Sequence, residues 1–274
     1  MTKELQKKVD FAIKLLRSIH TDEEIEISFS GGKDSSVILE IAKMAGIKYR
    51  AIYKATTIDP QGTIAFCKEN GCEIIMPKKT MLQLISERGF PTRRVRYCCE
   101  VLKEYKVCNY SVQGIRKCES EARKKRYKEP EICRSYGKDK VKVYFPILEW
   151  TDKDVADFIR ERGIKCHDLY YKNGKFDVTK RLGCMICPMC SNKNQIEQFK
   201  KYPKFVKLWI DRGRIWWNKE RKKEIVSKKK FRNVEDLFVH NLFFSNYEDF
   251  TYVFYGMFPI DSKEFLEKYF NIKL

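Results

Sequence analysis

A short loop with two adjacent glycines, Ser30–Ser36, separates two segments of different periodicity. The segment before it, Glu24–Phe29, alternates along the chain and contains two isoleucines, which predicts a strand. The segment after it places apolar side chains at helical spacing from Val37 to Ala45 and ends at Gly46, which predicts a helix. A strand that turns through glycines directly into a helix favours a β-α-β unit, and such units build parallel sheets.

The same alternation continues through the first part of the chain. Further strands are expected over residues 49–53, 73–76 and 110–113, and further helices over residues 61–70, 81–88, 100–107 and 152–162. The pattern predicts an α/β fold, a parallel twisted sheet with flanking helices of the Rossmann-like type. Aromatic and basic residues interleave towards the C-terminus, where we expect a helical, basic region. We place a boundary near residue 165, so that residues 1–165 form a nucleotide-binding α/β domain and residues 166–274 form the cysteine-containing helical region.

The glycine loop is suited to an anion. Gly31 and Gly32 let the backbone approach a ligand closely, and the following helix directs its N-terminal amides at that ligand. Lys33 adds a mobile positive charge, whereas Asp34 repels a phosphate unless a divalent cation stands between them. The loop therefore predicts nucleotide binding with Mg²⁺. Its spacing matches neither the Walker A motif nor the Rossmann glycine fingerprint.

Two later segments follow predicted strands and carry residues suited to a nucleotide. Gly114 ends one strand and is followed by Arg116 and Arg123, whose guanidinium groups can bind phosphate or sulfate oxygens in a forked geometry. For Arg116 we favour this role over a solvated helix face. Thr57 and Asp59 follow another strand, and the carboxyl ends of parallel strands line the ligand crevice. Asp59 is interpreted either as a ligand of ribose or metal or as the start of the next helix.

The 11 cysteines indicate metal binding or catalysis, because we expect neither a secretion signal nor a membrane-spanning run and thiols stay reduced in the cytoplasm. Five of them form two motifs, the pair Cys98-Cys99 and the repeat Cys184-x-x-Cys187-x-x-Cys190. A Cys-x-x-Cys turn presents two thiolates to one metal. Adjacent cysteines suit the separate irons of a cluster better than they suit one tetrahedral ion.

Three interpretations of these motifs are open. The favoured one is a [4Fe–4S] cluster with four ligands, Cys98, Cys99, Cys184 and Cys187. Cys190 is then an alternative ligand or a free thiol that handles sulfur. The second is a structural Zn²⁺ held by the Cys-x-x-Cys-x-x-Cys motif, with Cys166 or His167 as the fourth ligand. The third is a set of unligated thiols that act as small apolar residues.

Five segments, taken in order, resemble the PP-loop ATP pyrophosphatase superfamily and, within it, the phosphoadenosine phosphosulfate (PAPS) reductase family. They are Ser30–Ser36, Thr57–Pro60, Cys98-Cys99 with Lys103, Gly114–Arg123 and Pro146–Cys187. In its motifs the chain is similar to adenylyl-sulfate reductases and to the PP-loop proteins of DNA phosphorothioation. The resemblance implies an adenine nucleotide α-hydrolase-like fold. It also implies cleavage of ATP between the α- and β-phosphates, or binding of an adenylyl sulfate in the same pocket.

The resemblance implies roles for individual residues as well. The implied cofactor-binding residues are Ser30, Gly31, Gly32, Lys33, Asp34, Ser35, Ser36, Thr57, Asp59, Gly114, Arg116 and Arg123. Catalytic roles are expected for Lys33, Asp34 and Arg116. The implied cofactors are ATP, Mg²⁺ and a [4Fe–4S] cluster, with Zn²⁺ as the alternative to the cluster.

The formal net charge of +19 suggests a polyanionic partner, and nucleic acid, either DNA or tRNA, is the first candidate. The tryptophans and lysines of the C-terminal region are interpreted either as a nucleic-acid surface or as a helical cap whose tryptophans pack inward. We expect a cytoplasmic protein without membrane association. Its further expected partners are an adenine nucleotide and a sulfur-donor protein.

Sulfonucleotide reductases carry a catalytic cysteine in a C-terminal Glu-Cys-Gly-x-His segment, whereas no cysteine follows Cys190 in this sequence. The favoured expectation is therefore an enzyme that binds ATP and activates an acceptor by adenylation, with pyrophosphate release, for sulfur transfer to nucleic acid. One alternative is a sulfonucleotide reductase that lacks its own catalytic cysteine and takes the thiol from elsewhere. The other is a non-catalytic sensor of nucleotides or nucleic acid.

Overall fold

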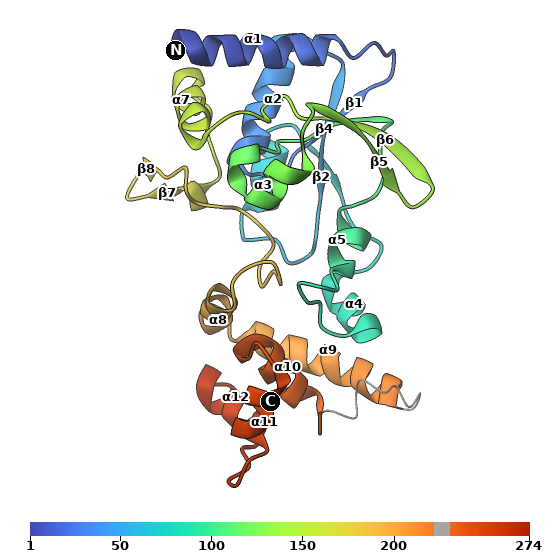
Figure 1. The fold of residues 1–274 in the computed structure, drawn as a ribbon, viewed down its shortest axis with the longest axis vertical. Helices are drawn as coiled ribbons and strands as arrows, with labels where there is room; N and C mark the ends of the chain where they lie inside the picture. Colours follow the sequence, from blue (N-terminus) through green and yellow to red (C-terminus); the bar gives the residue numbers. More distant parts are fainter. Residues whose placement is uncertain (222–230) are drawn as a thin grey trace. The chain divides into compact units, whose positions relative to one another are not determined.

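The computed structural model describes residues 1–221 and 231–274, and the chain divides there into two compact units (Figure 1). The first unit comprises residues 1–55, 59–77 and 102–183, and the second comprises residues 56–58, 78–101 and 184–274. This division falls elsewhere than the expected boundary near residue 165. Residues 166–183 belong with the α/β unit, while residues 78–101, inserted between two strands of the sheet, belong with the helical unit.

A six-stranded sheet forms the centre of the first unit. Its strands are β1 (Ile25–Ser28), β2 (Tyr49–Lys54), β3 (Glu73–Ile75), β4 (Tyr110–Val112), β5 (Glu131–Tyr136) and β6 (Asp139–Tyr144). They lie in the order β3-β2-β1-β4-β6-β5, and every neighbouring pair is parallel except β5 with β6. The predicted α/β fold with a parallel sheet is confirmed.

The sequence pattern does not predict the antiparallel hairpin of β5 and β6. Along β5 exposed and half-buried residues alternate, and the strand pairs with the sheet on one side only. A half-exposed edge strand carries few apolar residues, so its periodicity resembles that of a polar loop. In the missed hairpin, β5 is the edge strand, whereas β6 pairs with β4, whose end leads to Gly114.

Apolar helix faces complete the core of the first unit. Its described helices are α1 (Lys3–Arg17), α2 (Lys33–Ala45), α3 (Thr63–Glu69), α6 (Glu121–Arg126) and α7 (Asp152–Arg162). Both α1 and α7 pack against α2, where Val9, Ile38 and Phe158 are completely buried. Helix α7 has the bounds that its sequence predicts, because Thr151 and Asp154 form a reciprocal cap at its start.

The strand order changes direction beside β1. The chain passes from β1 through α2 to β2 on one side, and it later adds β4 on the other side. In open α/β sheets such a point creates a crevice outside the carboxyl ends of the two strands, and ligands bind there. The glycine loop follows β1 and Gly114 follows β4, so the fold brings two of the predicted binding segments to this crevice.

The second unit is helical in its described part. Its helices are α4 (Met81–Arg88), α5 (Tyr97–Leu102, whose last residue belongs to the first unit), α8 (Asn192–Lys201), α9 (Lys204–Arg221), α10 (Val234–Phe243), α11 (Tyr247–Phe254) and α12 (Ser262–Phe270). The helix predicted over residues 100–107 was wrong in extent. Helix α5 ends at Leu102, and in the segment that follows Lys54 Nζ donates to the carbonyl oxygen of Tyr105 at 2.8 Å. Among the described residues, every helix is too short or too polar to traverse a lipid bilayer.

Aromatic side chains form the core of the second unit. Phe90 stacks on Trp209 with ring centroids 6.4 Å apart, and Phe199 meets Trp209 edge-on at 5.9 Å. Trp209 and Trp217 are 4% and 6% exposed. These tryptophans of α9 therefore pack inward, which favours the helical cap over an outward stacking surface for bases. The basic run over residues 222–230, which contributes to the expected nucleic-acid surface, lies outside the described residues.

Candidate functional site

The glycine loop has the strand–turn–helix geometry that its sequence predicts. Gly31 adopts a φ of 74°, and Gly32 is the N-cap of α2. A Cβ at position 31 would meet Leu182 Cδ2 at 3.0 Å, so both the backbone angle and the space favour glycine. No described side chain caps Gly32. The first turn of α2 therefore offers amide donors and the positive end of the helix dipole to an anion.

The serines of the loop hold its shape. Ser35 and Ser36 donate to the carbonyl oxygen of Gly32 at 2.7 and 3.2 Å. The amide of Gly32 in turn donates to Ser30 Oγ at 3.3 Å. Ser35 and Ser36 are buried, and their hydrogen bonds to Gly32 stabilise the turn. Direct binding of the nucleotide by these three hydroxyls stays a prediction.

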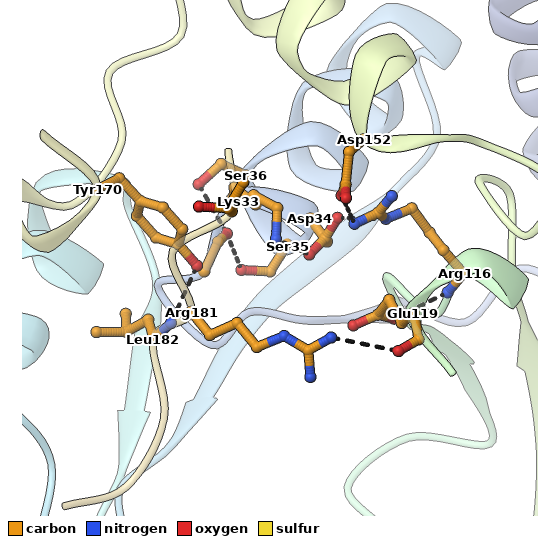
Figure 2. Close-up of polar contacts among 12 residues, drawn as sticks. Lys33, Asp34, Ser35, Ser36, Arg116, Glu119, Asp152, Tyr170, Arg181 and Leu182 are labelled. Carbon is orange, nitrogen blue, oxygen red and sulfur yellow. Dashed lines mark hydrogen bonds and ion pairs between the residues drawn. The ribbon is translucent and has the colours of Figure 1, made fainter. Parts of the chain in front are cut away.

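Four charged side chains form a connected cluster beside the loop, and Figure 2 shows Arg116 reaching two carboxylates. Lys33 Nζ lies 3.3 Å from Asp34 Oδ2, and Arg116 Nε donates to Asp34 Oδ1 at 2.7 Å. Arg116 Nη2 donates to Asp152 Oδ1 at 2.7 Å. The structure thus brings together the three residues predicted as catalytic. It adds Asp152, which the sequence marks only as the start of a helix.

Arg116 is buried yet remains charged in this cluster. Its side chain is 1% exposed, whereas that of Asp152 is 56% exposed. Burial lowers the pKa of Arg116, but the charge of Asp34 and the hydrogen bond to Asp152 outweigh burial, so the pKa is raised overall. The guanidinium group is therefore held in one orientation by its two carboxylate partners.

Asp34 contacts two positively charged side chains, Lys33 and Arg116. One carboxylate oxygen faces Lys33 and the other accepts from Arg116. A Mg²⁺ ion beside Asp34 would be repelled by both positive groups, so this geometry does not favour Asp34 as a magnesium ligand. In nucleotide sites Mg²⁺ is commonly held by the phosphates together with one or two carboxylates and water. Binding of Mg²⁺ stays a prediction, for an ion that the phosphates of a nucleotide would hold.

Gly114 allows the end of β4 to lie directly against the loop. A Cβ at this position would lie 2.9 Å from the backbone carbon and oxygen of Asp34. Backbone atoms in a packed region cannot move aside as a flexible side chain can. A larger residue would separate the two strand ends, and Arg116 would then no longer reach Asp34.

A second group of cations lies near the first. Arg123 forms an ion pair with Glu119. Arg181 Nη2 donates to the carbonyl oxygen of Glu119 at 3.3 Å (Figure 2). Burial and then the charge of Arg181 lower the pKa of Arg123. Arg123 and Arg181 therefore repel each other, and a bound anion would reduce that repulsion. Arg181 was not predicted from the sequence, because it lies within the segment Pro146–Cys187 without a local signal that distinguishes it from other basic residues.

Tyr170 closes one side of the glycine loop and was also missed. Its hydroxyl accepts from the amide of Leu182 at 3.2 Å, and Lys33 Nζ lies 5.8 Å from the centre of its ring (Figure 2). Burial raises the pKa of Tyr170, while hydrogen bonds from the amides of Lys33 and Leu182 oppose that rise. The tyrosine thus packs the segment around Leu182 onto the loop. No local sequence signal distinguishes it from other core tyrosines.

Thr57 and Asp59 are placed differently from each other. Thr57 belongs to the second unit, has a φ of 64°, and accepts a hydrogen bond from the amide of Met81 at 2.9 Å. Asp59 belongs to the first unit. Asp59 lies near Cys67, because burial and then the charges of Cys72 and Asp59 raise the pKa of the Cys67 thiol to about 12. Their nucleotide-binding roles stay predictions.

The cysteines of the two predicted motifs all belong to the second unit and influence one another. A hydrogen bond with Cys99, burial and the charge of Cys187 raise the pKa of Cys98. A hydrogen bond with Cys187, burial and the charge of Cys184 raise the pKa of Cys190. Mutual repulsion of this kind is what a bound metal cation removes from a set of thiolates. Within the described residues, however, no three His, Cys, Asp or Glu side chains already stand in metal-binding geometry.

Hydrogen bonds fix the backbone that carries the second cysteine motif. Gln195 Nε2 donates to the carbonyl oxygen of Cys187 at 2.7 Å, and the amide of Ile186 donates to Gln198 Oε1. Arg93 Nη2 donates to the carbonyl oxygen of Cys190 at 3.0 Å. Ile186 adopts a φ of 55°, which is unusual for a β-branched residue. The all-sulfur donor set and its braced loop therefore fit a thiolate-bound metal centre.

The two residues considered as a fourth zinc ligand are engaged in the first unit. His167 Nε2 lies 3.4 Å from Thr63 Oγ1, and His167 Nδ1 accepts from the amide of Leu169 at 3.2 Å. Burial raises the pKa of Cys166 to about 12, so its thiol stays protonated. Their surroundings do not favour either residue as a metal ligand.

Residues 24–190 match the family model of the phosphoadenosine phosphosulfate reductase domain. The fold and the glycine loop are thus those of an α/β domain of the PP-loop type. The chain belongs to the phosphoadenosine phosphosulfate reductase domain family.

The similar proteins of known sequence or structure are only distantly related to this chain. An uncharacterized protein of Methanocaldococcus jannaschii is 29% identical over 201 residues, which cover 68% of this chain and 47% of that protein. The chain spans less than half the length of the curated relatives it matches. The PAPS reductase of Candida auris is 14% identical, with 67% of this chain and 96% of that chain covered and a TM-score of 0.44. The U34-tRNA thiolase NcsA of Methanococcus maripaludis, solved with its [4Fe–4S] cluster, is 16% identical, with 84% of each chain covered and a TM-score of 0.45.

Proposed function

We propose that this chain binds ATP, adenylates an oxygen of nucleic acid with release of pyrophosphate, and so prepares that position for sulfur transfer. The observation that carries the proposal is the buried Lys33–Asp34–Arg116 cluster beside the uncapped N-terminus of α2. Membership of a family named for an adenine sulfonucleotide supports an adenine nucleotide as the ligand.

The proposed reaction is redox-neutral. The acceptor oxygen forms a bond to the α-phosphorus while the bond from that phosphorus to the α,β-bridging oxygen breaks, and pyrophosphate takes the electron pair. A sulfide-level sulfur donor then forms a bond to the activated atom of the acceptor, and AMP leaves with the former acceptor oxygen. Both steps depend mainly on positioning and on neutralising the charge of the leaving phosphates.

The described side chains suit these steps. The amides at the start of α2 and Lys33 would neutralise the phosphates that leave as pyrophosphate. Arg116 is held between Asp34 and Asp152, so it acts as a positioning residue that keeps Lys33 and Asp34 in place. Arg123 and Arg181 would receive further phosphate oxygens, because their mutual repulsion falls when an anion binds.

The sulfur-linked part of the proposal rests on the cysteines of the second unit. We assign a [4Fe–4S] cluster to Cys98, Cys99, Cys184 and Cys187, with Cys190 as an alternative ligand and Zn²⁺ as the alternative metal. An iron–sulfur centre, when bound, supplies a site for sulfur chemistry. Iron, zinc and acid-labile sulfide measured on anaerobically purified protein test this assignment. Colourless protein with zinc alone would contradict the cluster.

The acceptor assignment rests on charge. The formal net charge of +19 favours a polyanion, and a sulfur-donor protein is the further partner that the chemistry requires.

Labelled ATP tests the activity directly. The protein is incubated with ATP, Mg²⁺ and sulfide, with tRNA or DNA or neither, and the expected products are pyrophosphate and AMP in equal amounts only when nucleic acid is present. Lys33→Met should lower turnover at least about 100-fold, since it removes charge where charge develops. Lys43→Met, on an exposed position of the same helix, is the matched control. Equal turnover in the two variants would refute the role of the loop.

A sulfonucleotide reductase is the second candidate, and the paired Arg123 and Arg181 favour it because they suit a ligand with an additional sulfate or phosphate. The same incubation with adenylyl sulfate, phosphoadenylyl sulfate and a dithiol distinguishes it. Sulfite in place of pyrophosphate would favour the reductase, and tight nucleotide binding without any product would favour a sensor.

A further inference from the structure

A cavity of about 840 Å³ lies wholly within the second unit. Its wall includes residues of the turn at 90–94, of the second cysteine motif, and of helices α8, α9 and α10. The volume falls in the range of pockets that hold small organic ligands. The cavity is separate from the glycine loop, and the proposed function assigns it no role.

The wall of this cavity combines aromatic rings with positive charge. Phe90, Phe199 and Trp209 supply apolar lining, in which Phe90 is half-buried and the other two are buried, and Arg93 and Arg94 are exposed at the turn. None of the described residues that line the cavity is acidic. Aromatic faces beside arginines, without carboxylates, suit a planar ring attached to a phosphate.

Two ring nitrogens in this wall have no hydrogen-bond partner among the described residues, namely Trp209 Nε1 and His240 Nε2. Trp209 is 4% exposed, so its indole N–H is a buried donor without an acceptor. His240 Nδ1 lies 3.3 Å from Asn241 Oδ1, which can only accept. The tautomer that donates from Nδ1 to this oxygen leaves Nε2 as an acceptor. A ligand that carries both an acceptor and a donor would satisfy the two nitrogens.

We propose that this cavity receives a nucleobase of single-stranded nucleic acid. The hydrogen-bonding edge of every base carries an acceptor next to a donor, and its ring can pack on Phe90, which is half-buried in this wall. Arg94 is exposed at the turn and would meet the phosphate of the same nucleotide. The identity of the ligand rests on the proposed function, in which nucleic acid is the acceptor.

The cavity is directly connected to the second cysteine motif. Ile186 and Gln195 line the cavity, and Gln195 also binds the carbonyl oxygen of Cys187. Arg93 lines the cavity and binds the carbonyl oxygen of Cys190. A base in the cavity would therefore contact the side chains that brace the cysteine loop, which places the acceptor strand beside the proposed sulfur centre.

Fluorescence titration with short single-stranded oligonucleotides tests the inference. Eight-residue RNA and DNA strands are compared with the same strands that carry abasic sites throughout, and we expect the abasic strands to bind at least about 10-fold more weakly. Tighter binding of RNA than of DNA would identify RNA as the source of the base, and the reverse would identify DNA. Equal binding of abasic and normal strands would overturn the inference.

Variants separate the cavity from general charge. Arg94→Gln should weaken oligonucleotide binding about 3- to 10-fold. The slope of log affinity against log salt concentration should fall by the amount expected for about one phosphate contact. Trp209→Phe keeps most of the ring packing, removes the indole donor, and should weaken binding about 10-fold. Arg212→Gln, an exposed position on α9 outside the cavity, is the control and should follow wild type. Melting curves exclude variants that fail to fold, and Arg94→Gln carries the test if Trp209→Phe is among them.

This inference and the proposed function can fail separately. Loss of base-dependent binding in Arg94→Gln, without pyrophosphate release by the wild type, would support the cavity and refute the adenylation. Pyrophosphate release by the wild type, with Arg94→Gln and Arg212→Gln binding oligonucleotides equally, would refute the cavity alone.

Discussion

Replacement of Arg116 by glutamine probes the cluster on which the site depends. The guanidinium group is 1% exposed, lies 2.7 Å from Asp34 Oδ1 and 2.7 Å from Asp152 Oδ1, and is held in its charged form. Glutamine has similar volume near the backbone but cannot bridge the two carboxylates. The change therefore leaves Asp34 without its closest positive partner.

The expected loss of stability follows from the burial of each partner. Breaking a buried ion pair costs about 3–5 kcal/mol. Asp34 keeps Lys33 at 3.3 Å and its side chain is 17% exposed, so the lower end, about 3 kcal/mol, applies. The pair with Asp152, whose side chain is 56% exposed, adds less than about 1 kcal/mol. A loss of this size lowers the melting temperature by roughly 6–12 °C for a unit of this size.

Urea and thermal denaturation at neutral pH measure this effect. Lys117→Gln removes the same charge from the next residue, whose partner Glu149 is 66% exposed, and should cost no more than about 0.5 kcal/mol. Arg116→Lys keeps the charge without the fork and should recover less than half of the loss. If Arg116→Gln and Lys117→Gln unfold at the same urea concentration, the cluster does not hold the loop in place.

Three further outcomes are expected. Gly114→Ala should weaken ATP binding at least about 10-fold in calorimetric titration, because a Cβ there meets the backbone of Asp34 at 2.9 Å, whereas Gly183→Ala adds its Cβ in open space and should bind as wild type. Asp236 has a lowered pKa because hydrogen bonds from its arginine, serine and tyrosine partners outweigh burial. The charged Asp236 therefore stabilises the fold above about pH 4, and this stabilisation is lost as pH falls further. At neutral pH the unfolding free energy of Asp236→Asn should be lower than that of the wild type, and between about pH 5 and pH 3 it should fall less than that of the wild type. Gln198→Ala removes the acceptor for the amide of Ile186, and iron or zinc content per chain should fall at least about 10-fold if the cysteine loop needs that support; unchanged metal content would contradict this role.

Local structure was predictable wherever nearby residues decide it. The helices over Met81–Arg88 and Asp152–Arg162 have the bounds expected from sequence, because capping side chains stop fraying within a few residues of each end. The glycine loop likewise follows from two residues without Cβ atoms between a strand and a helix. The β5–β6 hairpin was missed, since an exposed edge strand carries a weak apolar pattern.

The amino-acid sequence by itself determined the α/β fold class, the glycine turn with Lys33 and Asp34, and the family. These depend on short-range periodicity and on glycine at defined positions. Only the tertiary structure decided that Asp34 faces Arg116 rather than an open metal position, that Arg181 lies beside Glu119, and that Trp209 packs inward. Those outcomes depend on contacts between residues far apart in the chain, and a one-dimensional pattern contains no signal for which distant charges and rings will meet.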